Sequence, residues 1–131
     1  MRRIFVVAAL AALIMSCSQQ APKVEHLRVE GTALMNESGD TVELKGMSFG
    51  WNVLWPRFYN AQAVKHVVKD WDAELVRAAI GVEIDDDECQ VENYLKNPEF
   101  GKQCACTIVD AAIENGVYVL VDWHAHGLHT E

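Results

Sequence analysis

The sequence has few basic residues. It contains 11 lysines and arginines against 19 aspartates and glutamates, so its formal charge at pH 7 is −8. A surface this acidic argues against nucleic acid and anionic membranes as partners, because both carry negative charge themselves. The composition therefore favours a neutral or cationic partner.

The sequence also lacks a hydrophobic run long enough to cross a bilayer. Its longest run, residues 4–14, follows Arg2 and Arg3 and precedes a small residue, whereas a spanning helix needs about 20 apolar residues. A charged start, a short apolar segment and a small residue before the cut are typical of a secretory signal. We predict that residues 1–17 are a signal peptide, and losing its two arginines takes the formal charge from −8 to −10.

The end of this leader resembles a bacterial lipobox. In that motif the cysteine, here Cys17 after Ile14-Met15-Ser16, becomes the lipidated first residue of the mature protein. Plain secretion, with Cys17 simply near the cut, is the alternative. We predict a lipid anchor at Cys17 and a tether over residues 18–26. The protein is then secreted or held on the outer surface of a bacterial envelope, with the membrane as a partner only through this anchor.

Cysteine is scarce beyond the leader, where Cys89, Cys104 and Cys106 remain. Cys104 and Cys106 are two residues apart on a predicted helix, so they point to different faces and do not readily pair with each other. A bridge between Cys89 and Cys104 is the alternative that an oxidising compartment allows. We favour buried free thiols.

One stretch of the chain has the pattern of a buried parallel strand. Residues 117–121 are apolar without a break and mostly β-branched or aromatic, as in a strand covered on both faces. Asp122, His124 and His126 follow at alternate positions, so their side chains emerge on one face if the strand continues. In α/β barrels and open α/β sheets, active sites are built at that carboxyl end.

The segment before it begins with the two-residue alternation of β-strands. Two alternating arms, residues 27–35 and 41–46, lie on either side of a turn cluster that contains Gly39. This pattern predicts a β-hairpin with its turn at residues 36–40. The second arm runs on into residues 46–50, which we predict to be the first inner strand of a sheet.

Helix patterns and a second strand fill the chain between these strands. A predicted helix from residue 61 to about 70 has Asn60 as its N-cap and apolar residues at helical spacing up to Trp71, which we place in the core. Residues 75–80 are a predicted buried strand with one charge inside it. A helix of roughly 17 residues then begins at Pro98 and ends at the Asn115-Gly116 pair.

The predicted order after the hairpin is β-α-β-α-β. Alternation of this kind implies a parallel sheet with right-handed crossovers. The chain ends a few residues after its third inner strand, and an unpaired parallel edge is unusual in a finished soluble protein. We therefore predict that the chain is the front part of a larger catalytic domain.

Three segments resemble the first three strands of the cellulases of glycoside hydrolase family 5. They read L-K-G-M-S-F-G, L-V-R-A-A-I-G and V-Y-V-L-V-D-W-H-A-H, and begin at Leu44, Leu75 and Val117. The resemblance covers residues 27–131, including the hairpin and the intervening spacings. It implies an α/β fold, a (β/α)8 TIM barrel of which only the N-terminal hairpin and the first three strands with two helices are present. It also implies hydrolysis of a β-glucan, cellulose or a related β-1,4-linked polysaccharide, with retention of configuration and without a cofactor.

The same resemblance implies roles for individual residues. In the family, the arginine that ends the second strand and the histidine that ends the third support the active site, and these are Arg77 and His124 here. A second histidine, His126, and the aromatic residues Trp51 and Trp55 of the first loop are implied to contact the substrate.

Physical chemistry supports a site role for Arg77. An arginine inside an apolar strand needs a carboxylate partner, because an unpaired buried charge is costly. Retaining glycosidases use two carboxylates about 5–5.5 Å apart; Arg77 would hold the nucleophile ionised, and His124 would hydrogen-bond near the attacked sugar. The resemblance places both catalytic glutamates on the fourth and seventh strands, beyond Glu131, so we expect the chain alone to be inactive.

Simpler interpretations of these residues stay open. Arg77 fits a structural ion pair in any sheet, and His126 and His129 fit solvated loop histidines. The acidic run at residues 85–88 fits a solvated surface, because it lacks the alternating pattern and the glycine of a calcium loop.

Two other functions also stay open. The His124 and His126 pair fits the alternate histidines that hold a metal in amidohydrolase barrels, although that motif belongs on a first strand and two β-α units precede it here. A non-catalytic carbohydrate-binding remnant is the other alternative. Our preferred interpretation needs neither a metal nor a cofactor.

Overall fold

A computed structural model of the chain describes residues 24–127. Its elements, in chain order, are β1 (Arg28–Glu30), β2 (Ala33–Met35), β3 (Gly46–Trp51), the 3-10 helix η1 (Pro56–Phe58), α1 (Ala61–Asp70), β4 (Leu75–Gly81), α2 (Pro98–Asn115) and β5 (Tyr118–His124). The predicted signal peptide, Cys17 and His129 lie outside the described residues. Within residues 24–127, no helix has the length and apolar character needed to cross a bilayer.

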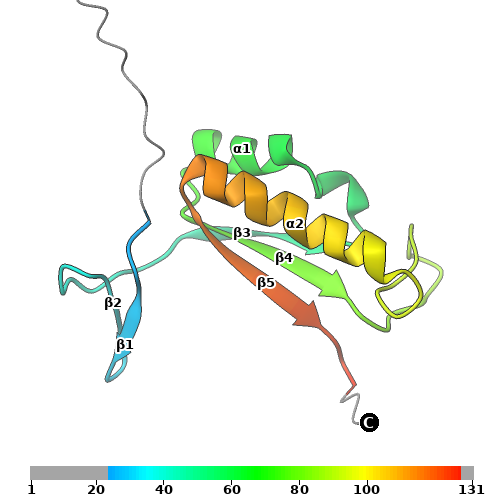
Figure 1. Cartoon of the computed structure of the whole chain (residues 1–131), viewed down its shortest axis with the longest axis horizontal. Coiled ribbons are helices and arrows are strands. Elements are labelled where there is room, and N and C mark those ends of the chain that lie inside the picture. Colours follow the sequence, from blue (N-terminus) through cyan, green and yellow to red (C-terminus); the bar gives the residue numbers. More distant parts are fainter. Residues whose placement is uncertain (1–23, 128–131) are drawn as a thin grey trace, which may run out of the picture.

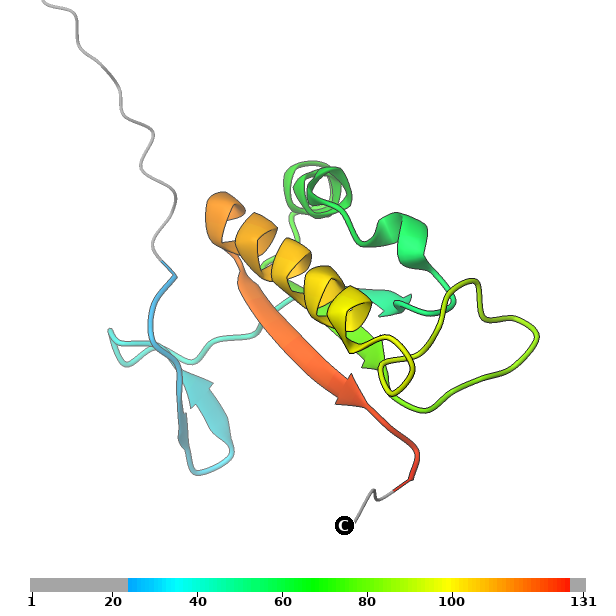
Figure 2. The same cartoon turned by 45° about the vertical axis from the view of Figure 1, so that its right-hand side comes forward.

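The predicted alternation of strands and helices is confirmed. Strands β3, β4 and β5 form a parallel sheet in that order, and α1 and α2 lie together on one face of it, with the β1-β2 hairpin to one side (Figure 1). In the turned view, no helix of the described residues covers the opposite face of the sheet (Figure 2).

The ends of both helices lie where their capping residues predict them. The side chain of Asn60 accepts a hydrogen bond from the backbone N–H of Ala63 at 2.9 Å, and that of Asn97 accepts one from Phe100 at 3.2 Å. Gly116 ends α2 in the left-handed conformation with φ 66°. Such caps satisfy backbone groups that the helix itself leaves unpaired.

The core lies between the sheet and the two helices. Val76, Ala78 and Ile80 of β4 point toward the helices and pack against a set of buried residues there, namely Val64, Val67, Cys104, Ile108, Ala111 and Ala112. Because side chains alternate along a strand, Arg77 points to the uncovered face of the sheet. That face is therefore the one on which β4 can present polar groups.

The predicted turn at residues 36–40 forms, but the longer antiparallel pairing lies across an earlier turn that was not predicted. β1 and β2 pair antiparallel and are joined at Gly31, which adopts φ 62°. Residues 36–40 form a second turn that is closed by a single bridge between Met35 and Thr41. A tight turn with a left-handed glycine fits the twist of an antiparallel pair, so the earlier turn makes the hairpin and the later arm leaves it to start β3.

The core position predicted for Trp71 is wrong. Its side chain is 57% exposed, because Trp71 is the C-cap of α1, with φ −120°, and no longer follows the helical spacing. It packs edge-on against His66, with ring centroids 5.5 Å apart.

The three cysteines among residues 24–127 are free, and one of these three is buried. Cys104 lies in the core between α2 and the sheet, whereas Cys106 is exposed and Cys89 is intermediate. Burial raises the pKa of the Cys104 thiol. The expectation of buried thiols is therefore wrong for Cys106, whose position two residues further along α2 faces solvent.

Candidate active site

A bulge in β3 turns Trp51 toward the uncovered face of the sheet. Ser48 pairs with Arg77 of β4, but Trp51 pairs only two residues further along β4, so β3 contains one extra residue. Gly50, at φ 70°, supplies the left-handed conformation, and a Cβ at this position would come within 2.6 Å of the Trp55 indole. Without the extra residue, Trp51 would point to the helices, because residues three apart on a strand face opposite sides.

Polar side chains of all three strands meet on the uncovered face. Nη2 of Arg77 donates to Oδ2 of Asp122 at 2.5 Å and lies 3.0 Å from Nδ1 of His124. Nη1 of Arg77 donates to Oγ of Ser48 at 3.0 Å. These contacts fix the guanidinium from both sides, on the face opposite the hydrophobic core.

Asp122 and Arg77 both contact Nδ1 of His124. Nδ1 of His124 lies 2.8 Å from the Asp122 oxygen that accepts from Arg77. Nη2 of Arg77 lies 3.0 Å from the same nitrogen, so Nδ1 donates to Asp122 in one tautomer and accepts from Arg77 in the other, and in both it is engaged within the network. Nε2 of His124 is then the ring atom left to contact a ligand.

The pKa of Asp122 lies below its ordinary value. Burial by itself raises the pKa, but hydrogen bonds from His124 and Arg77, with the Arg77 charge, lower it further than burial raises it. The exposed fractions of the Arg77 and Asp122 side chains are 32% and 26%, so water screens this ion pair less than a fully exposed one. Asp122 is consequently ionised at neutral pH and holds its two partners together.

Asp122→Asn is expected to reduce stability at pH 7 but not at acid pH. Because the folded pKa lies below the unfolded value of about 3.9, the pair contributes stability above that pH and loses it as the pH falls through the folded pKa. We expect a loss of about 1 kcal/mol in the free energy of unfolding at pH 7, measured by chemical denaturation of the protein that contains this chain.

The exposed pair of His66 and Asp70 provides a matched control. Its carboxylate side chain is 61% exposed, so Asp70→Asn should change stability by less than about 0.5 kcal/mol. A loss in Asp122→Asn that is equally large at pH 7 and near pH 3 would show that the Asp122 charge makes no contribution.

Three rings meet beside this network at the ends of β3 and β5. The ring centroid of Trp51 lies 4.4 Å from that of His124 and 5.1 Å from that of His126, and the two imidazoles are 5.5 Å apart. Trp51 and His124 are partly buried and His126 is exposed. The Trp51 indole, which packs against His124 and is flanked by His126, offers a ring for an amphipathic ligand to stack on.

Trp55 does not join this cluster. It lines an apolar groove of about 540 Å³ between β3 and α1, together with Phe58 and Trp71. The guanidinium of Arg57 lies over the Trp55 ring, 4.9 Å from its centroid. Of the predicted site residues, the structure brings together Arg77, His124, Trp51 and His126 and leaves Trp55 apart.

Sequence reasoning missed Asp122 as the partner of Arg77. The alternate positions of Asp122 and His124 predict that both point to one face, which is confirmed by their shared contact with Arg77. The strand register pairs Arg77 with Leu120, so the contact with Asp122 is diagonal and depends on the length of the arginine side chain. The alternation of Asp122 and His124 indicates that both lie on one face, but it does not give the register between β4 and β5 that brings Arg77 to Asp122.

Within residues 24–127, no group of three histidine, cysteine, aspartate or glutamate side chains is arranged to hold a metal ion. The chemistry visible on this face is a carboxylate between a guanidinium and an imidazole, next to an indole.

The chain matches known sequences over most of its length. Residues 35–131 match the family described as "Cellulase (glycosyl hydrolase family 5)". The chain is 33% identical to endoglucanase Z of Dickeya dadantii in an alignment of 131 residues. That alignment covers 95% of this chain and 29% of that protein. It is 36% identical to an endoglucanase of Halalkalibacter akibai in an alignment of 93 residues, and that alignment covers 71% of this chain and 11% of that protein.

Solved structures share the fold. One from Cytophaga hutchinsonii is 41% identical with a TM-score of 0.69 and covers 76% of this chain and 30% of that chain. The catalytic domain of an endoglucanase of Thermobifida fusca is 28% identical with a TM-score of 0.64, over 76% of this chain and 30% of that one. A variant of that domain is known in complex with cellotetraose.

These neighbours confirm the predicted fold class. They are (β/α)8 barrel catalytic domains, and the chain has the hairpin, three strands and two helices of such a barrel. The chain spans 30% or less of the length of the relatives named above. The amidohydrolase alternative gains no support from these matches.

Proposed function

The chain belongs to the cellulase family, glycosyl hydrolase family 5, and from this premise we propose that the protein containing it is an endo-β-1,4-glucanase acting on cellulose or a related β-glucan. The observation that carries the proposal is the meeting of Asp122, His124 and Trp51 at the carboxyl ends of β3 and β5, where the side chain of Arg77 reaches them from the third residue of β4. Barrel enzymes build their active sites at that end.

A neutral polysaccharide suits the surface of this site. The Trp51 indole can stack on the apolar face of a sugar ring, while the neighbouring polar groups hydrogen-bond to its hydroxyls. The formal charge of −8 does not repel a neutral polymer, whereas it disfavours an anionic one.

The proposed mechanism is hydrolysis with retention of configuration. It requires a nucleophile and an acid/base, two carboxylates about 5–5.5 Å apart, which we place on the fourth and seventh strands of the barrel. Residues 27–131 are then the N-terminal part of the catalytic domain. Their share of the work is to bind and orient the sugar and to set the charge around the nucleophile.

Arg77 and His124 divide this work between them. Asp122 and Ser48 fix the Arg77 guanidinium before substrate arrives, so its remaining N–H groups can stabilise the ionised form of a carboxylate placed beside it. Asp122 holds Nδ1 of His124, which leaves Nε2 to hydrogen-bond near the attacked sugar. Both groups act without moving, which keeps the reorganisation cost of the transition state low.

Endo-cleavage is tested with carboxymethyl-cellulose. We expect the protein that contains this chain to lower the viscosity of the solution well before reducing ends accumulate, and to release the β-anomer first when proton NMR follows a short cello-oligosaccharide. A folded protein that binds the polymer but releases no reducing ends would instead favour the non-catalytic binding alternative.

We also propose that the protein is exported and anchored through Cys17. The support comes from the sequence alone, from the charged start, the apolar segment and the lipobox-like Ile14-Met15-Ser16-Cys17. Radioactive palmitate should label the wild-type protein in a bacterial host. Equal labelling of a Cys17→Ser variant would contradict the anchor.

A further inference from the structure

Glu83 joins the segment after β4 to the segment after β5. Its Oε1 accepts hydrogen bonds from the backbone N–H groups of His126 at 2.5 Å and Gly127 at 3.0 Å. Hydrogen bonds to a carboxylate are roughly twice as strong as those between neutral groups. One side chain thus holds two consecutive peptide groups of another segment.

These hydrogen bonds lie beyond the end of β5, where the backbone no longer pairs with the sheet. β5 ends at His124, whose carbonyl still accepts a hydrogen bond from the backbone of Val82 at 3.2 Å. His126 lies beyond this point and its side chain is exposed, so side-chain packing does little to fix it. Its ring nevertheless lies 5.1 Å from that of Trp51.

We propose that Glu83 is a positioning residue, whose carboxylate holds the backbone of His126 so that the His126 ring flanks Trp51 and completes a binding site for one sugar unit of the glucan. The inference rests on the proposed β-glucan substrate. It assigns Glu83 no contact with the sugar itself, since Glu83 acts through His126.

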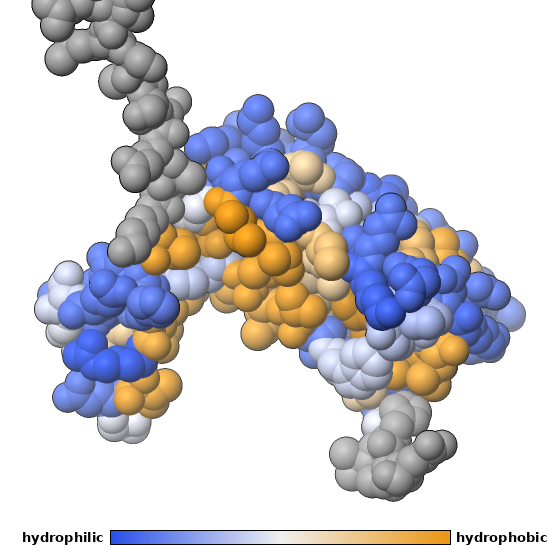
Figure 3. All heavy atoms as spheres, viewed as in Figure 1, coloured by the Kyte–Doolittle hydropathy of each residue, from blue (hydrophilic) through white to orange (hydrophobic). Residues whose placement is uncertain are grey.

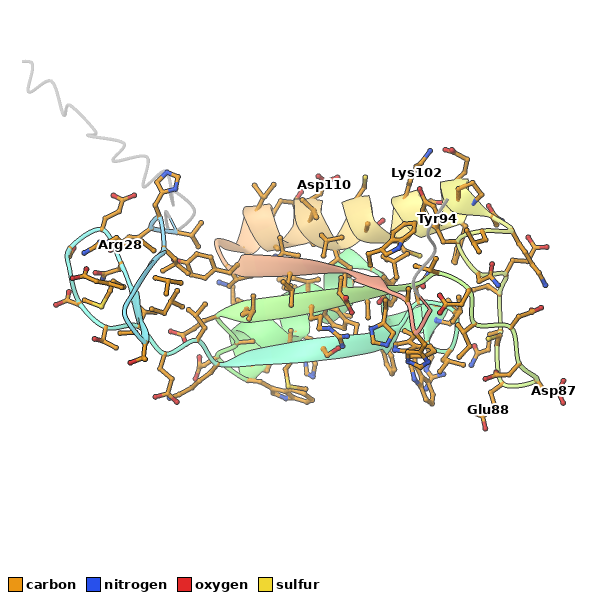
Figure 4. All side chains as sticks on the ribbon, turned by 90° about the horizontal axis from the view of Figure 1, so that it is seen from below. Arg28, Asp87, Glu88, Tyr94, Lys102 and Asp110 are labelled. Atoms are coloured by element: carbon orange, nitrogen blue, oxygen red, sulfur yellow. The ribbon has the colours of Figure 1, made fainter. Side chains whose placement is uncertain are left out.

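The carboxylate of Glu83 contacts the segment after β5, whereas the carboxylates of the acidic residues that follow it do not. Asp85 pairs with Lys96 at 2.5 Å, and Asp86 accepts a hydrogen bond from the backbone of Glu88 within the same loop. Asp87 and Glu88 project outward from the far end of the loop (Figure 4). The description of residues 85–88 as a solvated surface therefore does not extend to Glu83, whose carboxylate is directed toward the end of β5.

Three variants of the protein that contains this chain test the role. Glu83→Ala removes both hydrogen bonds, Glu83→Gln keeps an oxygen that can accept them, and Asp87→Ala removes a nearby charge that is directed away from the sheet. We expect Glu83→Ala to raise KM for cellotetraose roughly tenfold, the size of one charge-assisted hydrogen bond, with a smaller change in kcat. Glu83→Gln should recover most of the affinity, and Asp87→Ala should match wild type.

A spectroscopic readout separates positioning from general stability. The ring protons of His126, assigned by their loss in His126→Gln, should be shifted in the NMR spectrum by the ring current of Trp51. That shift should collapse toward the value of free histidine in Glu83→Ala and persist in Glu83→Gln. This NMR measurement requires no glucanase activity. A wild-type protein that hydrolyses no glucan would therefore refute the proposed function and leave the test of Glu83 intact.

Two results would overturn the inference. One is an unmoved His126 signal in Glu83→Ala. The other is an equal loss of affinity for cellotetraose in Glu83→Ala and Glu83→Gln, accompanied by an equal fall in their thermal midpoints. That result would mean that the charge of Glu83 stabilises the loop without positioning His126.

Discussion

Arg77→Met is expected to lower kcat/KM on carboxymethyl-cellulose by roughly a hundredfold or more, the typical cost of removing one preorganised group that stabilises charge at a reacting centre. The fold should survive, because a methionine fills a similar volume and Asp122 keeps its contact with Nδ1 of His124 at 2.8 Å. Without the guanidinium, the pKa of the proposed nucleophile rises. The acidic limb of the pH profile should therefore move to higher pH.

Arg28→Met is the matched control for this change. Arg28 lies in the hairpin, away from the three parallel strands (Figure 4), and pairs with Glu30 at 3.4 Å on the exposed surface. Its loss should leave kcat/KM and the pH profile unchanged. Normal turnover and an unmoved acidic limb in Arg77→Met would make Arg77 a structural ion-pair residue.

Residues 18–131 expressed on their own are expected to hydrolyse no carboxymethyl-cellulose and to unfold without a cooperative transition. The layers of side chains that fill a barrel come from strands around the full circle, and the described part of this segment, residues 24–127, supplies three such strands, with β3 and β5 at the edges. On β5, Leu120, Val121 and Trp123 are 51%, 49% and 56% exposed, so the burial on both faces that the sequence predicts for residues 117–121 is not found within residues 24–127. Figure 3 shows hydrophobic residues gathered over this part of the molecule.

Exposed strand edges with apolar side chains recruit other chains, so this segment should be insoluble or molten. Size-exclusion chromatography, amide NMR and thermal unfolding measure these properties, with the protein that contains the whole chain as the reference. A monodisperse monomer with dispersed amide signals would contradict the argument from the sheet edges. Glucanase activity in that preparation would overturn the assignment of the catalytic acids to later strands.

The features that could be predicted from the sequence depend on local interactions. Asn60, Asn97 and Gly116 mark the helix ends because each makes its capping contact within a few residues. The alternation of Asp122 and His124 likewise predicts their common face. These features need no knowledge of how distant segments meet.

The features that were missed depend on register and on competition between turns. The bulge at Gly50 decides which face Trp51 joins, and it is defined only by the pairing of β3 with β4. The contact between Arg77 and Asp122 joins residues 45 positions apart, and the alternation pattern does not specify it. Gly31 and Gly39 both fit a hairpin turn, and the tighter pairing across Gly31 decides between them.

The most direct test is hydrolysis of carboxymethyl-cellulose by the protein that contains this chain, measured before and after exhaustive treatment with EDTA. General acid/base hydrolysis of a glycoside needs no Lewis acid, so we expect the release of reducing ends to be equal in both samples. Activity that is lost with EDTA and restored by zinc, or no activity in a folded protein, would contradict the assignment as a retaining glucanase.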